Sequence, residues 1–113
     1  MSKEATQSVQ LGSIELPYVR YGAKGRPLLV LLHGGGGPLA TQGFAHTLAQ
    51  SYEIIAPTHP GFDGTPIPEF FNNIEDLVFL YLDFLDALDL SAVNLVGFSM
   101  GGWLAMELAV RST

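Results

Sequence analysis

The segment Gly97-Phe98-Ser99-Met100-Gly101-Gly102 contains residues whose types and spacing could support nucleophilic chemistry. It follows the pattern G-x-S-x-G between an expected strand and an expected helix. A turn this tight strains the backbone of the serine and lifts its hydroxyl above the sheet, and a side chain at position 97 or 101 would collide with the neighbouring strand or helix. The pattern therefore predicts that Ser99 is a nucleophile and that the Met100 N–H stabilises the oxyanion. The alternative is a turn of small residues that only lets strand and helix pack closely.

A second candidate element is the run His33-Gly34-Gly35-Gly36-Gly37-Pro38 at the end of an apolar strand. Glycines at a strand end permit the backbone to approach a ligand closely. A phosphate cradle is one interpretation, but the chain has neither G-K-[ST] nor G-x-G-x-x-G with a suitably spaced acid. We favour a backbone N–H donor that complements Met100 at an oxyanion hole, with a plain flexible loop as the alternative.

A general base for the serine is missing from the expected place. A serine hydroxyl is a weak nucleophile until a base removes its proton. After Ser99 the sequence contains no Asp and no His, and Glu107 lies two turns along the helix, pointing away from the turn. Of the earlier histidines, His46 is expected to be a surface or packing residue, whereas His59 follows a strand and is a weak candidate. Its neighbour Asp63 is too close in sequence to be a persuasive orienting carboxylate.

The pattern of apolar residues and breaks predicts an α/β arrangement. A hairpin turning at Gly12-Ser13 should join Val9–Leu11 to Ile14–Tyr21. Buried strands are expected at 27–32, 52–56 and 92–97, helices at about 41–50, 74–88 and 100–110, and an irregular loop from Pro57 to Pro68. The first helix should turn Phe44, Ala45 and Leu48 inward, and the second should be capped by Asn73 with Asp76 as partner.

Composition and charge exclude several classes of function. The chain has 113 residues, of which 48% are apolar, and its 11 acidic and 5 basic residues give a net charge of −6. No basic residue lies between Pro27 and Val110, so binding to nucleic acid or anionic lipid is not expected. There is no cysteine, no apolar leader and no run long enough to cross a bilayer, and the three histidines lack metal-ligand spacing. We expect a cytoplasmic protein with no cofactor and no metal.

Together, the His33-Gly34 strand end, the loop Pro60-Gly61-Phe62 and the segment around Ser99 resemble the N-terminal half of the α/β-hydrolase superfamily. The resemblance is to its esterase, lactonase, carbon–carbon-hydrolase and proline-iminopeptidase-like branches. It implies that Ser99 is the nucleophile, that Met100 and Gly35 (or Gly36, since the glycine run leaves the register open) supply the oxyanion donors, and that His33 is structural. The family often has Asp before the Pro-Gly loop, where this chain has Thr58-His59, which puts only the hydrogen bonding of that loop in doubt.

The resemblance implies a hydrolase that acts on an ester, lactone or related carbonyl substrate through an acyl-enzyme at Ser99. Residues 1–113 would form a single partial domain, in which a two-strand hairpin leads into a parallel sheet with flanking helices and which ends after the helix that follows Ser99. The strand before Ser99 would then be an unpaired edge, so we expect self-association or a complementing C-terminal half, and little or no activity for the chain alone. The alternatives are a non-catalytic binding module and an acyltransferase on the same scaffold.

Overall fold

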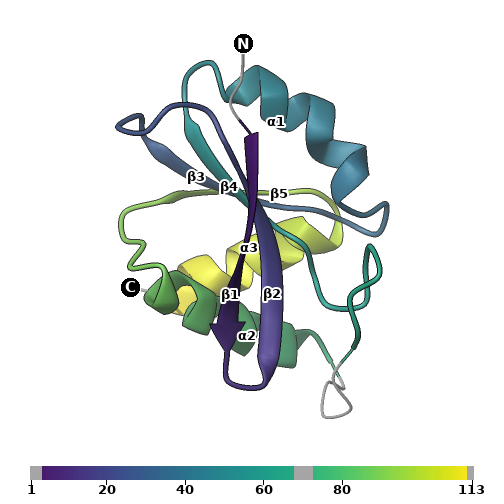
Figure 1. Ribbon diagram of the computed structural model, residues 1–113. Helices are drawn as coiled ribbons and strands as arrows, with labels where there is room; N and C mark the ends of the chain where they lie inside the picture. The colour runs from purple at the N-terminus through teal and green to yellow at the C-terminus, as the bar shows by residue number, and fades with distance from the viewer. Residues whose placement is uncertain (1–3, 68–72, 112–113) are drawn as a thin grey trace.

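The computed structural model describes residues 4–67 and 73–111, arranged as one mixed sheet with helices on both faces (Figure 1). Within these residues the elements are β1 (Glu4–Leu11), β2 (Ile14–Tyr21), β3 (Leu28–Leu32), a 3₁₀ turn (Pro38–Thr41), α1 (Gln42–Leu48), β4 (Glu53–Pro57), α2 (Ile74–Ala87), β5 (Asn94–Gly97) and α3 (Met100–Arg111). The strand order is β1-β2-β4-β3-β5. The predicted hairpin, strands and helices are therefore all present.

The strand pairing changes from antiparallel to parallel across the sheet. β1 pairs with β2 and β2 with β4 in antiparallel register, whereas β3 runs parallel to both β4 and β5. In the second parallel pair Leu32 lies opposite Gly97, so the ends of β3 and β5 meet at one edge of the sheet. This register brings the two glycine-rich segments together.

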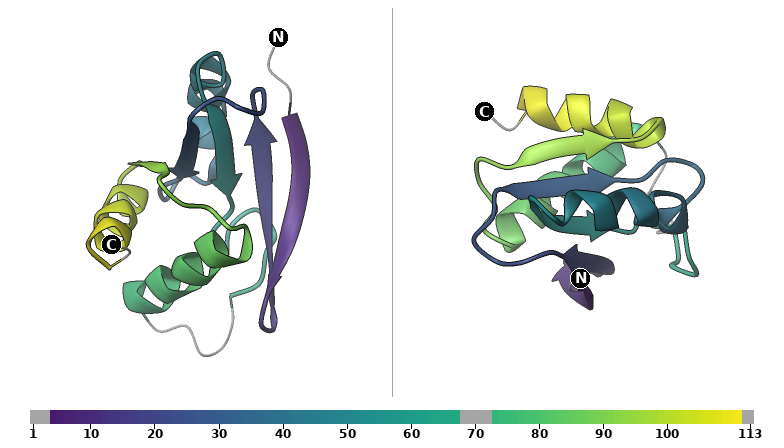
Figure 2. Two further views of the ribbon diagram at one scale, coloured as in Figure 1. Left: turned by 90° about the vertical axis from the view of Figure 1, so that its left-hand side faces the viewer. Right: turned by 90° about the horizontal axis from the view of Figure 1, so that it is seen from above.

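β3 and β4 are buried on both faces because separate helices cover each face (Figure 2). The prediction of a buried strand before Ser99 was wrong, since β5 at the edge of the sheet is exposed at Asn94 and only partly buried from Leu95 to Gly97. Val30 and Leu32 of β3 belong to the larger apolar cluster, with α2 and α3. Leu29 and Leu31 point to the opposite face and join a smaller cluster with α1. This alternation explains the continuous apolar run in the sequence, which is typical of a parallel strand covered on both sides.

The start of α2 was predicted correctly and has a defined cap. The Asn73 side chain accepts a hydrogen bond from the Asp76 N–H at 3.2 Å, and the Asp76 carboxylate accepts one from the Asn73 N–H at 3.3 Å. Both contacts satisfy N–H groups near the start of the helix that have no intrahelical acceptor.

The predicted inward face of the first helix was wrong at one residue. α1 is shorter than expected. Ala45 within it and the two residues that flank it, Thr41 and Ala49, are small and buried at four-residue spacing, which brings the helix close to the sheet. Phe44 is 47% exposed and packs edge-on against Phe98, with ring centroids 5.1 Å apart. Because the small residues occupy the face toward the sheet, the large ring lies at the flank of the helix.

Two strands differ in length from the prediction. β1 begins at Glu4 rather than near Val9, and β5 begins at Asn94 rather than Ala92, whose positive φ of 53° interrupts the strand. β5 forms the edge of the sheet among the described strands, as expected. The predicted loop from Pro57 to Pro68 is irregular after Pro57, although its last residue, Pro68, lies outside the described residues.

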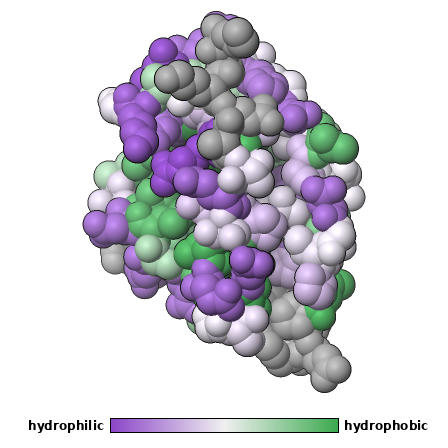
Figure 3. All heavy atoms as spheres, viewed as in Figure 1, coloured by the Kyte–Doolittle hydropathy of each residue, from purple (hydrophilic) through white to green (hydrophobic). Residues whose placement is uncertain are grey.

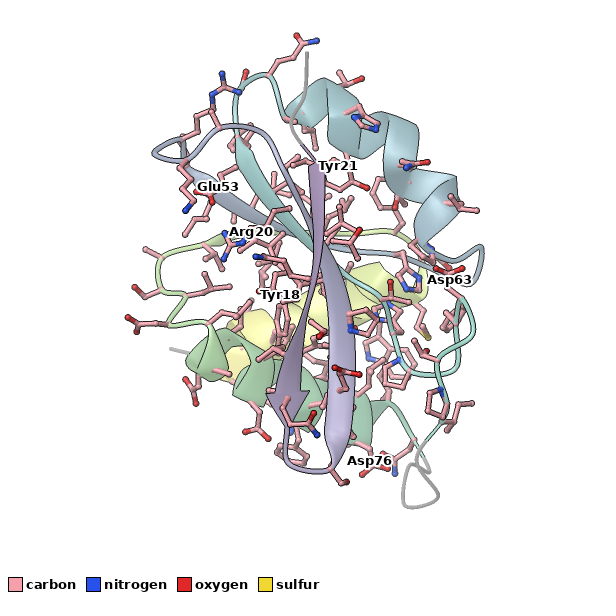
Figure 4. The ribbon with its side chains drawn as sticks, viewed as in Figure 1. Tyr18, Arg20, Tyr21, Glu53, Asp63 and Asp76 are labelled. Atoms are coloured by element: carbon pink, nitrogen blue, oxygen red, sulfur yellow. The ribbon has the colours of Figure 1, made fainter. Side chains whose placement is uncertain are left out.

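The surface mixes polar and apolar side chains. On the face seen in Figure 3, apolar patches are interrupted by hydrophilic residues. Arg20 of β2 and the largely buried Glu53 of β4 point toward each other (Figure 4) and form an ion pair at 2.9 Å. None of the described helices combines the length and hydrophobicity that crossing a bilayer requires.

Candidate active site

Ser99 occupies a sharp corner between β5 and α3. Its φ is +56°, a left-handed conformation that a non-glycine residue rarely adopts, and its side chain is exposed. Since β5 ends at Gly97 and α3 begins at Met100, only Phe98 and Ser99 make the turn. The predicted strain at Ser99 is therefore confirmed, as is the accessibility of its hydroxyl.

The glycines that flank this corner leave no space for a side chain. A Cβ at Gly97 would lie 2.0 Å from the Gly101 carbonyl oxygen, and one at Gly101 would lie 2.1 Å from the Leu32 carbonyl oxygen. Both contacts are with backbone atoms, which cannot rotate away. The predicted collision at positions 97 and 101 is therefore confirmed, and it explains why the corner needs glycine on both sides of the serine.

The end of β3 contacts this corner directly. A hydrogen bond of 3.0 Å joins the Phe98 N–H to the Leu32 carbonyl. The next glycine, Gly34, is buried, and a Cβ there would lie 2.6 Å from the Phe98 carbonyl oxygen and 3.1 Å from the Ser99 Cβ. The end of β3 was predicted from the sequence to be part of the site. The close approach of Gly34 to Ser99 was not, because it depends on the register between β3 and β5.

The glycine loop after β3 turns back on itself. The Gly37 N–H donates to the Gly34 carbonyl at 3.1 Å, and Gly37 has a φ of +80°. Gly35 and Gly36 are exposed at the tip of this turn. Met100, on the other side of Ser99, is the first residue of α3, where backbone N–H groups have no intrahelical acceptor. The candidate oxyanion donors thus flank Ser99 on two elements.

The histidines nearest this strand end are fully engaged in structural contacts. His33 and His59 are each 1% exposed, and their ring centroids lie 3.8 Å apart. The His59 ring nitrogens lie 2.6 Å from the Tyr81 hydroxyl and 2.6 Å from the His33 carbonyl oxygen. His59 is therefore committed at both nitrogens and is not placed to accept the proton of Ser99, whereas His33 is structural, as the resemblance implied.

Burial also alters the proton affinity of these groups. Desolvation, with a smaller effect of the neighbouring His33, lowers the pKa of His59 to about 4. Desolvation lowers the pKa of His33 too, against smaller upward effects of the Gly34 carbonyl and of Asp63, which is labelled in the loop after β4 in Figure 4. Burial raises the pKa of the Tyr81 hydroxyl. All three groups are therefore neutral at pH 7.

The remaining histidine and a large hollow lie apart from this arrangement. His46 packs edge-on against Tyr21 with ring centroids 5.1 Å apart, as expected of a packing residue. A hollow of about 920 Å³ lies between the hairpin and the loop after β4, but Ser99, Met100 and the glycines 34–37 are not among the residues that line it. Within the described residues, the site thus presents an exposed serine beside the backbone N–H groups of two glycine-rich segments.

The missed part of the site is the contact between His59 and Tyr81. His33 and His59 follow β3 and β4, and the parallel pairing of these strands places their ends side by side. The contact between the two histidines could have been predicted, because each follows a strand of the expected parallel sheet. No feature of the sequence indicated that Tyr81 of α2 contacts His59.

Comparison with known proteins gives a consistent assignment. The model of the family described as "Alpha/beta hydrolase family" matches residues 29–113. The dihydrolipoyllysine-residue acetyltransferase component of the acetoin cleaving system of Pseudomonas putida is 33% identical over 106 residues, which cover 93% of this chain and 29% of that protein. The 2-hydroxy-6-oxo-2,4-heptadienoate hydrolase of Pseudomonas putida is 34% identical over 116 residues, which cover 98% of this chain and 41% of that protein.

A solved structure described as a membrane phospholipase A and a bacterial virulence factor superposes with a TM-score of 0.87. It is 29% identical, and the match covers 96% of this chain and 36% of that one. The chain thus spans between 29% and 41% of the length of these three proteins.

Proposed function

The chain belongs to the α/β-hydrolase family, and from that premise we propose that it carries the nucleophile and the oxyanion hole of a serine hydrolase. The predicted resemblance and fold class are confirmed, and the sheet with its flanking helices corresponds to part of that fold. The observation that carries the proposal is the left-handed, exposed Ser99 between two glycines that admit no side chain.

The proposed reaction is acyl transfer through Ser99. A base takes the hydroxyl proton while Oγ attacks the substrate carbonyl, and the tetrahedral oxyanion is stabilised by the Met100 and Gly35 N–H groups. Collapse of this intermediate expels the leaving group with a proton and leaves an acyl-enzyme, which water then hydrolyses. Ser99, Met100 and Gly35 are thus the proposed site residues, with Gly36 as the alternative donor to Gly35.

We propose that the base comes from a complementing C-terminal half. After Ser99 the sequence contains no Asp and no His, and His33 and His59 are engaged with each other. The matched relatives are more than twice as long as this chain, which leaves room in them for further catalytic residues. On this proposal the chain alone has little or no turnover, because the serine stays protonated.

The substrate we propose is a small molecule with an ester, lactone or related carbonyl. An acyltransferase is the second candidate, because one relative is named as an acetyltransferase component. The two differ only in what attacks the acyl-enzyme, water or another acceptor. Added alcohols or thiols would be acylated by a transferase in preference to water, and product analysis separates the cases.

The test uses an external base in place of the missing one. The 113-residue chain is incubated with p-nitrophenyl acetate, with and without imidazole, and nitrophenol release is compared with that of Ser99→Ala. Ser91→Ala is the matched control, because Ser91 is also exposed but precedes β5. Because imidazole itself cleaves this ester, the reference rate is that of the same imidazole buffer without protein. We expect the chain and Ser91→Ala to exceed this rate, and Ser99→Ala to equal it. Equal rates for all three proteins would favour a non-catalytic binding module.

A further inference from the structure

Four hydrogen bonds connect the glycine loop beside Ser99 to helix α2. The His33 Nδ1 lies 2.8 Å from the Gly34 carbonyl oxygen, and the His33 Nε2 lies 3.0 Å from the His59 backbone nitrogen. The His59 Nε2 lies 2.6 Å from the His33 carbonyl oxygen, and its Nδ1 lies 2.6 Å from the Tyr81 hydroxyl. Tyr81 is 1% exposed on α2, so water does not compete for these groups.

The partners fix the position of every proton in this chain of contacts. A backbone N–H only donates and a carbonyl only accepts, so His33 carries its proton on Nδ1 and His59 carries its proton on Nε2. The His59 Nδ1 is then an acceptor, and the Tyr81 hydroxyl must donate to it. Each neutral ring has one donor and one acceptor, and both are used. No buried side-chain nitrogen or oxygen in the described ranges is left without a partner.

The last acceptor in the chain is part of the peptide that precedes Gly35. The Gly34 carbonyl receives the His33 Nδ1–H at 2.8 Å and the Gly37 N–H at 3.1 Å. A trans peptide is planar, and its carbonyl and N–H point in opposite directions. Holding the Gly34 carbonyl therefore fixes the direction of the Gly35 N–H. Gly36 follows one peptide later, so this restraint favours Gly35 over Gly36 as the oxyanion donor.

The same peptide lies against the nucleophile. Gly34 approaches the Phe98 carbonyl and the Ser99 Cβ so closely that a methyl group would not fit. A glycine run without restraint could rotate freely, since glycine has the widest choice of backbone conformations. An oxyanion donor contributes most when its orientation is set before the reaction begins. The glycines thus let the loop backbone approach Ser99 closely, while hydrogen bonds from the histidines fix the orientation of its peptide.

We propose that His59 and Tyr81 are positioning residues that, through His33, orient the Gly35 N–H of the oxyanion hole. This inference rests on the proposed function of Ser99. Neither residue touches the substrate. The low pKa of His59 agrees with this role, because a neutral His59 keeps its acceptor for Tyr81 across the neutral pH range.

The test measures the loop itself and not turnover. In ¹⁵N-labelled chain, the side-chain nitrogen shifts should identify His33 as the Nδ1–H form and His59 as the Nε2–H form. Tyr81→Phe removes only the hydroxyl and keeps the ring that packs on Phe84. We expect the Gly35 amide resonance to move. The Gly37 N–H, which donates to the Gly34 carbonyl, should exchange about ten-fold faster, which is the effect of losing roughly one neutral hydrogen bond.

Two further variants and one control separate positioning from general stability. His59→Leu should shift the Gly35 resonance and accelerate exchange at Gly37 as Tyr81→Phe does. His59→Gln should restore most of the protection at Gly37, because its side-chain amide can donate to the His33 carbonyl. Tyr18→Phe is the matched control, since Tyr18 is a buried tyrosine of the same cluster that packs on Phe84. It should leave the Gly35 resonance and the exchange rate of Gly37 unchanged.

Two results would overturn the inference. One is a Gly35 amide that does not respond to Tyr81→Phe, and the other is a rise in exchange that is equal across β3, β4 and the glycine loop, which would indicate general destabilisation. The function of Ser99 is tested separately by ester cleavage with imidazole. A responsive Gly35 in a chain whose Ser99 never reacts would therefore contradict the proposed function while leaving the hydrogen-bonded support of the loop in place.

Discussion

Two neighbouring glycines in the first turn of α3 should respond to alanine in opposite ways. At Gly101 a Cβ would lie 2.1 Å from the Leu32 carbonyl oxygen and 2.8 Å from the His33 carbonyl oxygen. At Gly102 the nearest atom would be the Gly97 carbonyl oxygen at 3.4 Å, an ordinary contact distance. Both residues lie in the helix, so the intrinsic effect of the substitution on helix formation is similar.

The contact at Gly101 is too short by about 1 Å, and its partners are backbone atoms of β3. The helix or the strand must move, and overpacking of this kind costs up to about 3 kcal/mol in the free energy of unfolding. Gly102→Ala meets no such obstacle and should raise that free energy by about 0.5–1 kcal/mol, because alanine loses less backbone entropy in a helix.

Urea unfolding followed by far-UV circular dichroism measures both effects. With a slope of about 1.5 kcal/mol per molar urea, Gly101→Ala should lower the midpoint by about 2 M and Gly102→Ala should raise it by about 0.5 M. A Gly101→Ala protein as stable as the parent would show that α3 and β3 are not in close backbone contact at this residue. This result would refute the close packing at the corner between β5 and α3, and the role proposed for Ser99 that depends on it.

Three more perturbations test other parts of the structure. Ser99→Gly should raise the free energy of unfolding by about 1 kcal/mol in urea titrations, because glycine adopts a φ of +56° without strain, and a loss of stability would contradict that backbone conformation. Lowering the pH should destabilise the chain, because His59 titrates near 4 when folded and near 6.5 when unfolded, so the unfolded state binds the extra proton between these values. The contribution of a neutral His59 to the free energy of unfolding is complete above pH 6.5 and falls by up to about 3 kcal/mol toward pH 4. The free energy of unfolding of His59→Gln should therefore differ less between pH 7 and pH 4.5 than that of the parent. An equal difference would indicate that His59 is solvated in the folded chain. Asn73→Ala should cost about 1 kcal/mol in thermal or urea unfolding by removing the cap of α2, whereas Asn73→Ser should retain most of the stability, and equal losses would argue against the cap.

Most of the fold and the corner at Ser99 could be predicted from the sequence, because local rules determine them. A continuous apolar run predicts a strand covered on both faces, and Asn73 with Asp76 predicts the start of a helix. The pattern around Ser99 predicts a strained turn because its glycines are needed wherever a strand and a helix meet this closely. These are short-range constraints, and each can be read within about a dozen residues.

The features that were missed depend on contacts between distant segments. Phe44 was expected to point inward, but the close approach of Ala45 and Ala49 to the sheet leaves no space for its ring there. Similarly, His59 was considered as a weak candidate base, and only the parallel pairing of β3 and β4 shows that its ring is committed to His33 and Tyr81. Periodicity predicts which residues are apolar in a helix, but not which of them meets a polar partner.

The function proposed here requires that Ser99 is a nucleophile beside a preformed oxyanion hole. The most direct test is to react the 113-residue chain with a fluorophosphonate in the presence of imidazole and to locate the adduct by peptide mass spectrometry. We expect a single adduct on Ser99, formed more slowly without imidazole. An adduct spread over exposed serines such as Ser91, or its complete absence from Ser99, would contradict it.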